Sequence, residues 1–299
     1  MAVRLGIQGS GQLVGDLPDP GVFREVATAA EELGFDSIWA GEHLSFTNPI
    51  LDVVVALSTF AAVTERIALG AAVVLLPLRH PSWVAKEFAS LDYVSGGRVV
   101  LGVGVGGEGV KDFEAAGVPV RERGARTDEA MRALRVLFRG GPASFSGRFS
   151  SFEGVSIAPG PARAGGPPLW VGGRSPAAIR RAATLGDGWF PIWMSPERFA
   201  AGAAQLPERA ERAVMLPVRV GGTADEVRAY LSQRYGTEFS TQAVERYCLF
   251  GGEERIAARL AEYVDAGARH VVFNLAVEPG QMSAQLRLLA ALQTVGARA

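Results

Sequence analysis

The sequence predicts an α/β fold, a single (β/α)8 TIM barrel that spans residues 1–299. Eight short apolar segments rich in β-branched residues alternate with longer segments that have the residue spacing of helices. The apolar segments are continuous, which is typical of parallel strands buried on both faces. No linker interrupts the series, and eight successive strand–helix units are expected to close into one barrel.

Each predicted strand is a short apolar segment that ends near glycine or a polar residue. In chain order the predicted strands are Val3–Ile7, Ser37–Ala40, Ile67–Val74, Val99–Val103, Leu169–Val171, Gly188–Pro191, Val214–Val220 and His270–Leu275.

The predicted helices have recognisable ends. Gly34 ends the first helix, Pro81 begins the third, and Ser175 with Pro176 forms the N-cap and first turn of the fifth. In chain order the predicted helices are Pro20–Leu33, Asp52–Val63, Pro81–Ser95, Thr127–Phe138, Pro176–Leu185, Glu197–Leu206, Ala224–Tyr235, Glu253–Ala266 and Gln281–Val295.

A hairpin-like insertion, about residues 140–168, follows the fourth helix and contains the segment "SFSGRFSSFEGVSIAP". Its end, Ala158–Pro168, is rich in proline and glycine. Because strands continue on both sides of this short segment, we interpret it as a surface loop, and a domain linker is the alternative.

The composition is that of an ordinary globular protein, with 48% hydrophobic and 20% charged residues and a formal net charge of −1. No basic stripe indicates a nucleic-acid partner, and no apolar segment is long enough to span a membrane. The single cysteine, Cys248, excludes an internal disulfide and is consistent with a reducing, cytoplasmic location.

In a barrel of this kind the chemistry is expected where strands end and the following loops begin. Glu42 and His43 lie at the end of the second predicted strand. Since histidine titrates near neutral pH, His43 could transfer a proton, with Glu42 tuning or orienting it. The alternative is a loop histidine capped by its neighbours. The spacing of the three histidines indicates no metal site.

Two glycine-containing segments are candidates for binding a cofactor. Gly102–Gly107 follows the fourth strand, too late in the chain for a dinucleotide-binding turn, and its backbone could approach a flat ring closely. Gly172 and Gly173 precede Arg174 and a capped helix, an arrangement that favours phosphate binding. A tight barrel rim and an ordinary capped helix are the respective alternatives.

Five segments in this order and spacing resemble the bacterial luciferase-like superfamily of flavin and deazaflavin oxidoreductases. They are "GFDSIWAGEHL", "TERIALGAAVVLLPLRHP", "LDYVSGGRVVLGVGVG", "RGARTDEAMRALRVLF" and "PPLWVGGRSPAAIRRAATLGDGW". Within the superfamily, the chain is most similar to the actinobacterial branch that depends on coenzyme F420, a deazaflavin.

The resemblance implies a (β/α)8 barrel with an insertion and a cofactor at its C-terminal mouth. It implies a cis peptide between Ala72 and Val73 and an acid–base role for His43, beside which Glu42 replaces the aspartate of several relatives. A glutamate of those relatives aligns close to Gly107, one residue before Glu108. The implied cofactor-binding residues are Ala72, Val73, Gly104, Val105, Gly106, Gly107, Glu108, Gly172, Gly173 and Arg174.

The leading functional hypothesis is an F420-dependent oxidoreductase that exchanges a hydride with a small, largely apolar substrate. One alternative is a two-component monooxygenase that uses reduced FMN from a separate reductase, and another is a flavin-binding barrel without turnover. The expected substrate-pocket residues are Gln8, Phe46, Leu76, Phe190 and Trp193, of which the apolar ones could instead be core residues. Relatives frequently form dimers, so a homodimer is also expected.

Overall fold

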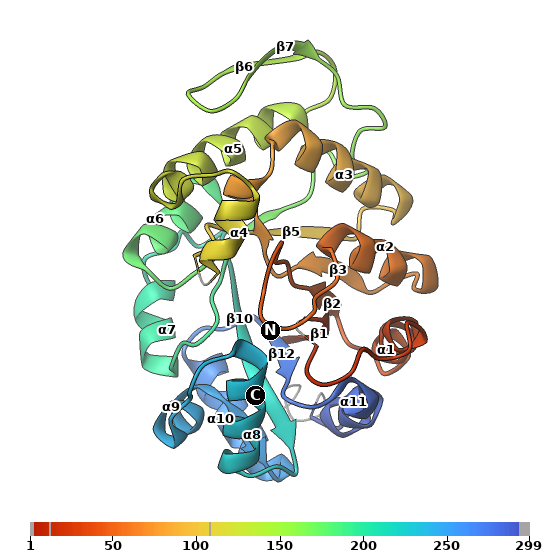
Figure 1. Cartoon of the computed structure of the whole chain (residues 1–299), viewed down its shortest axis with the longest axis vertical. Helices are drawn as coiled ribbons and strands as arrows, with labels where there is room; N and C mark the ends of the chain where they lie inside the picture. Colours follow the sequence, from red (N-terminus) through yellow and green to blue (C-terminus); the bar gives the residue numbers. More distant parts are fainter. Residues whose placement is uncertain (1–2, 12, 108, 293–299) are drawn as a thin grey trace.

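The computed structural model describes residues 3–11, 13–107 and 109–292. Its main sheet closes into a parallel barrel, around which the helices are arranged (Figure 1). In order around the barrel the strands are β1 (Arg4–Ser10), β2 (Ser37–Ala40), β3 (Ala68–Ala71) with β4 (Val74–Leu75), β5 (Val99–Gly104), β8 (Leu169–Gly172), β9 (Gly188–Phe190), β10 (Glu211–Val220) and β12 (His270–Leu275), which pairs with β1. The predicted fold class is therefore confirmed.

Helices connect successive strands, and most begin where the sequence predicts. The α-helices are α1 (Gly21–Glu32), α2 (Val53–Val63), α3 (Pro81–Val94), α4 (Val110–Ala115), α5 (Arg123–Leu137), α6 (Pro176–Leu185), α7 (Pro196–Ala203), α8 (Ala224–Tyr235), α9 (Thr241–Tyr247), α10 (Glu253–Asp265) and α11 (Met282–Ala290). Short 3-10 helices are η1 (Leu76–Leu78), η2 (Val120–Glu122) and η3 (Pro279–Gln281), and a short outer strand, β11 (Leu249–Gly251), pairs with β10.

The third predicted strand, Ile67–Val74, is divided in the structure. The Ala72–Val73 peptide is cis, as the family resemblance implies, and it separates β3 from β4. Residues near this break therefore leave the regular ladder and reach the mouth of the barrel.

Other elements differ from the sequence-based prediction. Strand β11 was not predicted, and α5 begins at Arg123, four residues before the predicted start. The short helices α4 and α9 have too few apolar residues in register to give a helical pattern, and they were not predicted. The final predicted helix, Gln281–Val295, extends beyond the described residues, and α11 ends at Ala290.

The barrel interior is filled by large side chains, so it is a packed core rather than a channel. Trp39 lies 5.2 Å from Trp170 and 4.6 Å from Phe190, measured between ring centroids. A Cβ at Gly70 would lie 2.1 Å from the Trp39 ring, so this glycine makes room for the indole. These rings form the floor beneath the mouth of the barrel.

The insertion contains an antiparallel hairpin, β6 (Ala143–Ser146) and β7 (Ser151–Val155), which lies beyond α5 in Figure 1. The Glu129 carboxylate on α5 accepts hydrogen bonds from the backbone N–H groups of Arg148, Phe149 and Ser150 at 2.7–2.8 Å. The hairpin is thereby fixed to the outside of the barrel, away from the strand ends that form its mouth.

Candidate active site

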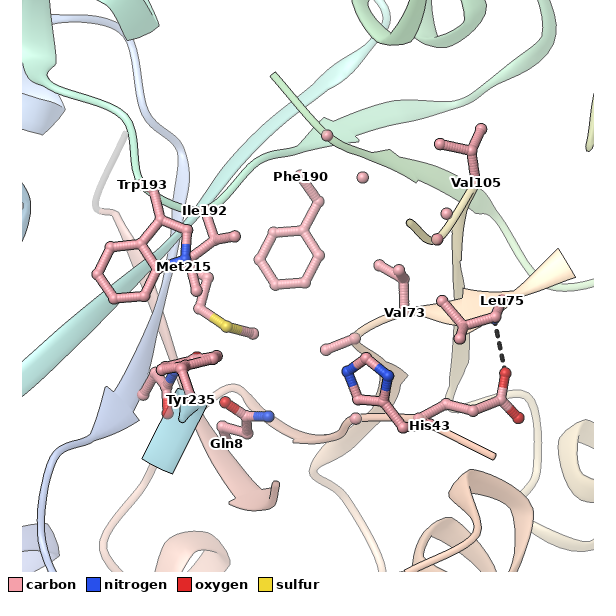
Figure 2. A pocket seen from close by; sticks show the side chains of 18 residues that line it. Gln8, His43, Val73, Leu75, Val105, Phe190, Ile192, Trp193, Met215 and Tyr235 are labelled. Carbon is pink, nitrogen blue, oxygen red and sulfur yellow. Dashed lines mark hydrogen bonds between the residues drawn. The ribbon is translucent and has the colours of Figure 1, made fainter. Parts of the chain in front are cut away.

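A cavity of about 210 Å³ lies at the carboxyl ends of the barrel strands (Figure 2). Residues from β1, β4, β5, β8, β9, β10 and β12 and from the segment after β2 meet there, as expected for the active end of a parallel barrel. The lining residues are Gln8, Gly41, Glu42, His43, Ala72, Val73, Leu75, Gly104, Val105, Gly106, Gly172, Gly173, Phe190, Ile192, Trp193, Met215, Tyr235 and Asn274.

His43 enters this cavity from the end of β2, and its ring is held by a carboxylate. The His43 Nδ1 atom lies 2.8 Å from Oδ2 of Asp112, a fully buried residue in the first turn of α4. The other Asp112 oxygen accepts hydrogen bonds from the backbone N–H groups of Leu44 and Ser45, both at 2.7 Å. With the Asp112 carboxylate as acceptor, Nδ1 carries the proton and Nε2 is left facing the cavity (Figure 2).

Asp112 is the principal functional residue that the sequence analysis missed. It lies 69 residues from His43 in the chain and belongs to the short α4 helix. Its sequence signal is weak, namely one acidic residue in a poorly helical segment that follows the fourth barrel strand. Only the packing of α4 against the loop after β2 shows that the two side chains meet.

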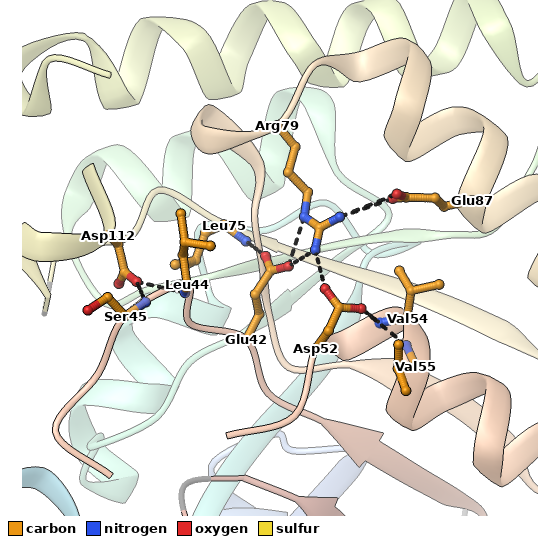
Figure 3. Close-up of polar contacts among 10 residues, drawn as sticks. All are labelled: Glu42, Leu44, Ser45, Asp52, Val54, Val55, Leu75, Arg79, Glu87 and Asp112. Carbon is orange, nitrogen blue, oxygen red and sulfur yellow. Dashed lines mark hydrogen bonds and ion pairs between the residues drawn. The ribbon is translucent and has the colours of Figure 1, made fainter. Parts of the chain in front are cut away.

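Glu42 does not orient His43. Its carboxylate accepts hydrogen bonds from the Leu75 backbone N–H at 2.6 Å and from Arg79 Nε at 2.8 Å (Figure 3). Successive residues of an extended segment point to opposite sides, so Glu42 and His43 diverge. Arg79 also contacts Asp52 at 2.7 Å and Glu87 at 3.2 Å.

The charge balance around Glu42 affects its protonation. Burial raises the pKa of the Glu42 carboxyl, while Arg79 and the Leu75 N–H oppose that rise. Three carboxylates thus share one guanidinium, and Glu42 is the most buried of them. Its contacts connect the end of β2 to β4, directly beyond the cis peptide.

The glycines predicted for cofactor binding surround Val73 in the cavity. A Cβ at Gly104 would lie 2.4 Å from Val73 Cγ2, and one at Gly172 would lie 3.1 Å from Val73 Cγ1. The absence of side chains at these strand ends therefore lets Val73 project into the mouth between β5 and β8. Gly106, with φ of +65°, continues this glycine-lined wall.

Arg174 stands at the edge of the cavity, immediately before α6. Ser175 caps this helix, because its hydroxyl accepts a hydrogen bond from the Ala178 N–H, and Pro176 is the first helical residue, as predicted. Arg174 Nη1 lies 3.4 Å from the carbonyl oxygen of Trp193, so the guanidinium is near the loop after β9.

The structure brings most other predicted site residues together. Gln8, Phe190 and Trp193 line the cavity, and Phe46 stacks on His43 with 4.1 Å between ring centroids. Leu76 is not in the cavity wall. It begins η1 and is buried in the main core, because the chain has already turned away from the mouth.

Of the two remaining predicted residues of the loop after β5, one does not line the cavity and the other lies outside the described residues. Gly107, with φ of +120°, does not line the cavity, and a Cβ there would lie 2.4 Å from Arg123. Glu108 lies outside the described residues.

Four further residues of the cavity wall were not predicted from the sequence, namely Ile192, Met215, Tyr235 and Asn274. These residues come from β9–β12 and α8, where periodicity alone does not indicate which side chains face the mouth. Gln8 Oε1 is buried there and has no hydrogen-bond partner among the described residues. The described residues include no group of three or more His, Cys, Asp or Glu side chains that could hold a metal.

Related proteins agree with this architecture. A protein of uncharacterized function from Mycobacterium tuberculosis is 35% identical over 187 residues, which cover 60% of this chain and 64%, just under two thirds, of the relative. The F420-dependent glucose-6-phosphate dehydrogenase of Rhodococcus erythropolis is 26% identical over 314 residues and 91% of each chain.

Two solved structures share the fold. An F420-dependent secondary alcohol dehydrogenase, solved with an F420–acetone adduct, matches with a TM-score of 0.84 and 18% identity over 99% of both chains. The monooxygenase RslO1 of Streptomyces bottropensis matches with a TM-score of 0.82 and 23% identity, over 96% of this chain and 98% of that one. Residues 3–235 match the family described as luciferase-like monooxygenase, and this chain belongs to that family.

Proposed function

We propose that this protein is an F420-dependent oxidoreductase that acts on a small, largely apolar organic substrate. The observation that carries the proposal is the His43–Asp112 pair, at 2.8 Å, beside a glycine-lined mouth. The names of two similar proteins, the relative from Rhodococcus erythropolis and the secondary alcohol dehydrogenase, support the choice of cofactor.

The cavity has features that fit a flavin or deazaflavin ring. Gly104 and Gly172 leave a wall of backbone and the Val73 side chain, against which a flat ring can lie. Gln8 Oε1 offers a buried acceptor for a hydrogen-bond donor of a ligand. The capped start of α6 and Arg174 would hold the cofactor phosphate.

When bound, F420 supplies hydride transfer at its C5 atom. The chain handles the proton: the unprotonated His43 Nε2 accepts it during oxidation of an alcohol, and in the reverse direction the imidazolium form of His43 donates it from Nε2 to a substrate oxygen. Asp112 holds Nδ1–H and so keeps Nε2 as the exchanging atom. Phe190 and Met215 exclude water from the inner end of the cavity.

We assign Glu42 a positioning role. Its bonds to Leu75 N–H and Arg79 fix the segment that follows Val73, and its carboxylate has no contact with His43 in the structure. Glu42 therefore acts on the shape of the cofactor wall rather than on the transferred proton.

The proposal is tested by anaerobic incubation of the protein with reduced F420 and a panel of aldehydes, ketones, enones and imines. Formation of oxidised F420 together with an equal amount of reduced product is the expected result. His43→Ala should lower the rate by about 100-fold or more, whereas His80→Ala, a change at the exposed N-cap of α3, should not. Oxygen consumption with reduced FMN, and no reaction with F420, would favour the monooxygenase instead.

A further inference from the structure

A second pocket, of about 880 Å³, adjoins the mouth of the barrel and shares Trp193 and Tyr235 with the inner cavity. Two cationic residues line it, Lys111 and Arg174, and Arg174 is the residue that we assign to the cofactor phosphate. The rest of its lining is notably aromatic. The five aromatic rings that line it are Phe46, Trp193, Tyr235, Phe239 and Tyr247, and they come from the loop after β2, the loop after β9, and the segment from α8 to α9.

Three of the rings form one continuous wall. Trp193 lies 5.1 Å from Phe239 and 5.6 Å from Tyr235, and Tyr235 lies 5.9 Å from Phe239, measured between ring centroids. None of the three ring pairs is a parallel stack, since their interplanar angles are 38–74°. The rings thus meet at tilted and edge-to-face angles, the geometry in which aromatic groups attract one another beyond simple area burial.

A further ring of the outer pocket comes from the loop after β2. Phe46 lines the outer pocket and stacks on the His43 ring at an interplanar angle of 25°. In Figure 2, Trp193 and Tyr235 lie across the cavity from Leu75 and Val105. A molecule bound in the outer pocket can therefore reach the inner cavity past Trp193 and Tyr235.

The loop after β2 is hydrogen-bonded to the end of α8. Asn48 Nδ2, from the loop that carries Phe46, donates hydrogen bonds to the carbonyl oxygens of Gln233 and Arg234 at 2.9 and 2.6 Å. These carbonyls end the helix α8 that carries Tyr235. The loop that carries Phe46 is thereby joined to the helix that carries Tyr235.

Trp193 has an uncommon backbone conformation. Its φ is +59°, and it is the one residue other than glycine with a positive φ in the described part of the chain. A bulky residue in this region is strained, and such strain is concentrated at functional sites. Here the conformation places the indole where it lines both pockets.

We propose that the outer pocket binds an aromatic ring of the substrate, with the reacting alcohol or carbonyl group at the inner end beside His43. This rests on the proposed function, because it names the substrate class for the same site. It predicts aryl alcohols and aryl carbonyl compounds as ligands, in preference to saturated analogues and to sugar phosphates.

The test compares 2-naphthalenemethanol with its decahydro analogue and with glucose 6-phosphate, by anaerobic titration calorimetry on protein loaded with reduced F420, which cannot accept a hydride from these ligands. The saturated alcohol is the more hydrophobic of the two alcohols. A pocket that selects ligands only by their apolar area would therefore bind it at least as tightly as the naphthyl alcohol. We expect the naphthyl alcohol to bind about tenfold more tightly. Equal binding of the two alcohols, or tightest binding of glucose 6-phosphate, would overturn the proposal.

Two variants give the matched comparison. Phe239→Leu keeps apolar area and removes a ring, so it should weaken the naphthyl alcohol about fivefold and leave the saturated alcohol unchanged. Phe145→Leu removes an equivalent ring from the β6–β7 hairpin and should change neither affinity. An equal loss for both alcohols in Phe239→Leu would contradict an aromatic contact.

Cofactor binding is measured separately by fluorescence quenching. If F420 does not bind while protein without cofactor still prefers the naphthyl alcohol, the proposed function fails and the aromatic pocket stands. If F420 binds and the preference is absent, the aromatic pocket fails and the proposed function stands.

Discussion

Asp112 determines which nitrogen of His43 can exchange a proton. Its carboxylate receives the Nδ1–H and two backbone N–H groups, so both oxygens have partners and the imidazole has one orientation. The Nε2 atom is then free to face a ligand, and the loop of Leu44 and Ser45 is fixed by the same carboxylate. Asp112 thus determines both the tautomer of His43 and the position of this loop.

Replacing Asp112 by asparagine tests this role. The amide can donate to Nδ1 and would favour the tautomer that protonates Nε2, so kcat/KM should fall about 100-fold. The F420 affinity should not change, and stopped-flow oxidation of reduced F420 measures the rate. Glu114→Gln, an exposed change on the same helix, is the control. An unaltered rate in Asp112→Asn would remove Asp112 from the mechanism.

The positioning role of Glu42 has a separate signature. Glu42→Gln removes the buried carboxylate from the half-buried Arg79, so the free energy of unfolding should fall by about 2 kcal/mol in urea denaturation. Glu87→Gln removes a longer, half-exposed contact to the same Arg79 and should cost less than about 1 kcal/mol. Loss of turnover in Glu42→Gln with full stability and unchanged F420 affinity would instead give Glu42 a role in the chemistry.

At the scale of single residues, the sequence indicates His43 because it follows a strand and the barrel has its chemistry there. It does not indicate Asp112, because no local pattern connects two residues from different loops. Glu42 is next to His43 in the chain, which suggests that the two side chains contact each other. Because successive side chains point to opposite sides, they do not.

Among the elements, the loop after β2 carries His43 and Phe46 and is fixed at two points. Asp112 binds its beginning, and Asn48 joins its far end to the last carbonyls of α8. The loop therefore positions the His43 ring, which we propose to be catalytic, and the Phe46 ring of the proposed substrate pocket as one unit.

Asn48→Ala should loosen this unit. Loss of the hydrogen bonds to α8, each contributing about 1 kcal/mol, should speed amide hydrogen exchange in residues 44–48 by about tenfold or more. Mass-spectrometric hydrogen exchange measures this, and Gln205→Ala, just after α7, is the control. Unchanged exchange would mean that the tie to α8 does not hold the loop.

Element boundaries follow from the sequence where caps and periodicity agree. Pro176–Leu185 and Ala224–Tyr235 begin at a capped serine or threonine and match the structure. The boundaries of α4 and α9 do not follow from the sequence, because six or seven residues are too few to give a helical period. The break at Ala72–Val73 follows from the family resemblance and not from local propensity.

On the scale of the whole molecule, the barrel is predictable because eight apolar strands recur at regular intervals and can be buried only by closing on one another. What fills the barrel is less predictable. His270 lies in its closed end, with the Nε2 atom 2.7 Å from Ser37 Oγ. The Ser37 hydroxyl accepts a hydrogen bond from the Trp39 indole N–H.

The described chain contains no helix with the length and apolarity needed to cross a membrane.

Burial of His270 makes the stability of the barrel depend on pH. Desolvation, with a smaller contribution from Arg4, lowers the pKa of His270 to about 3. The unfolded chain then binds a proton that the folded chain does not, so the stabilisation is present above a pH of about 6.5 and is lost as pH falls toward 3.

The free energy of unfolding should therefore fall by up to about 1.4 kcal/mol per pH unit between pH 6 and pH 4 because of this group. His270→Asn should flatten that part of the profile, whereas His80→Asn, an exposed position, should leave it unchanged. Urea denaturation at a series of pH values measures the slope. An identical slope in His270→Asn and in the natural sequence would contradict the assignment.

The central claim, that the mouth of this barrel holds a deazaflavin, is tested most directly by equilibrium binding of F420 and of FMN, each oxidised and reduced, followed by fluorescence quenching. We predict that F420 binds at least tenfold more tightly than FMN and that Arg174→Ala weakens F420 binding by a similar factor. Tight binding of reduced FMN with no measurable binding of F420 would contradict the account.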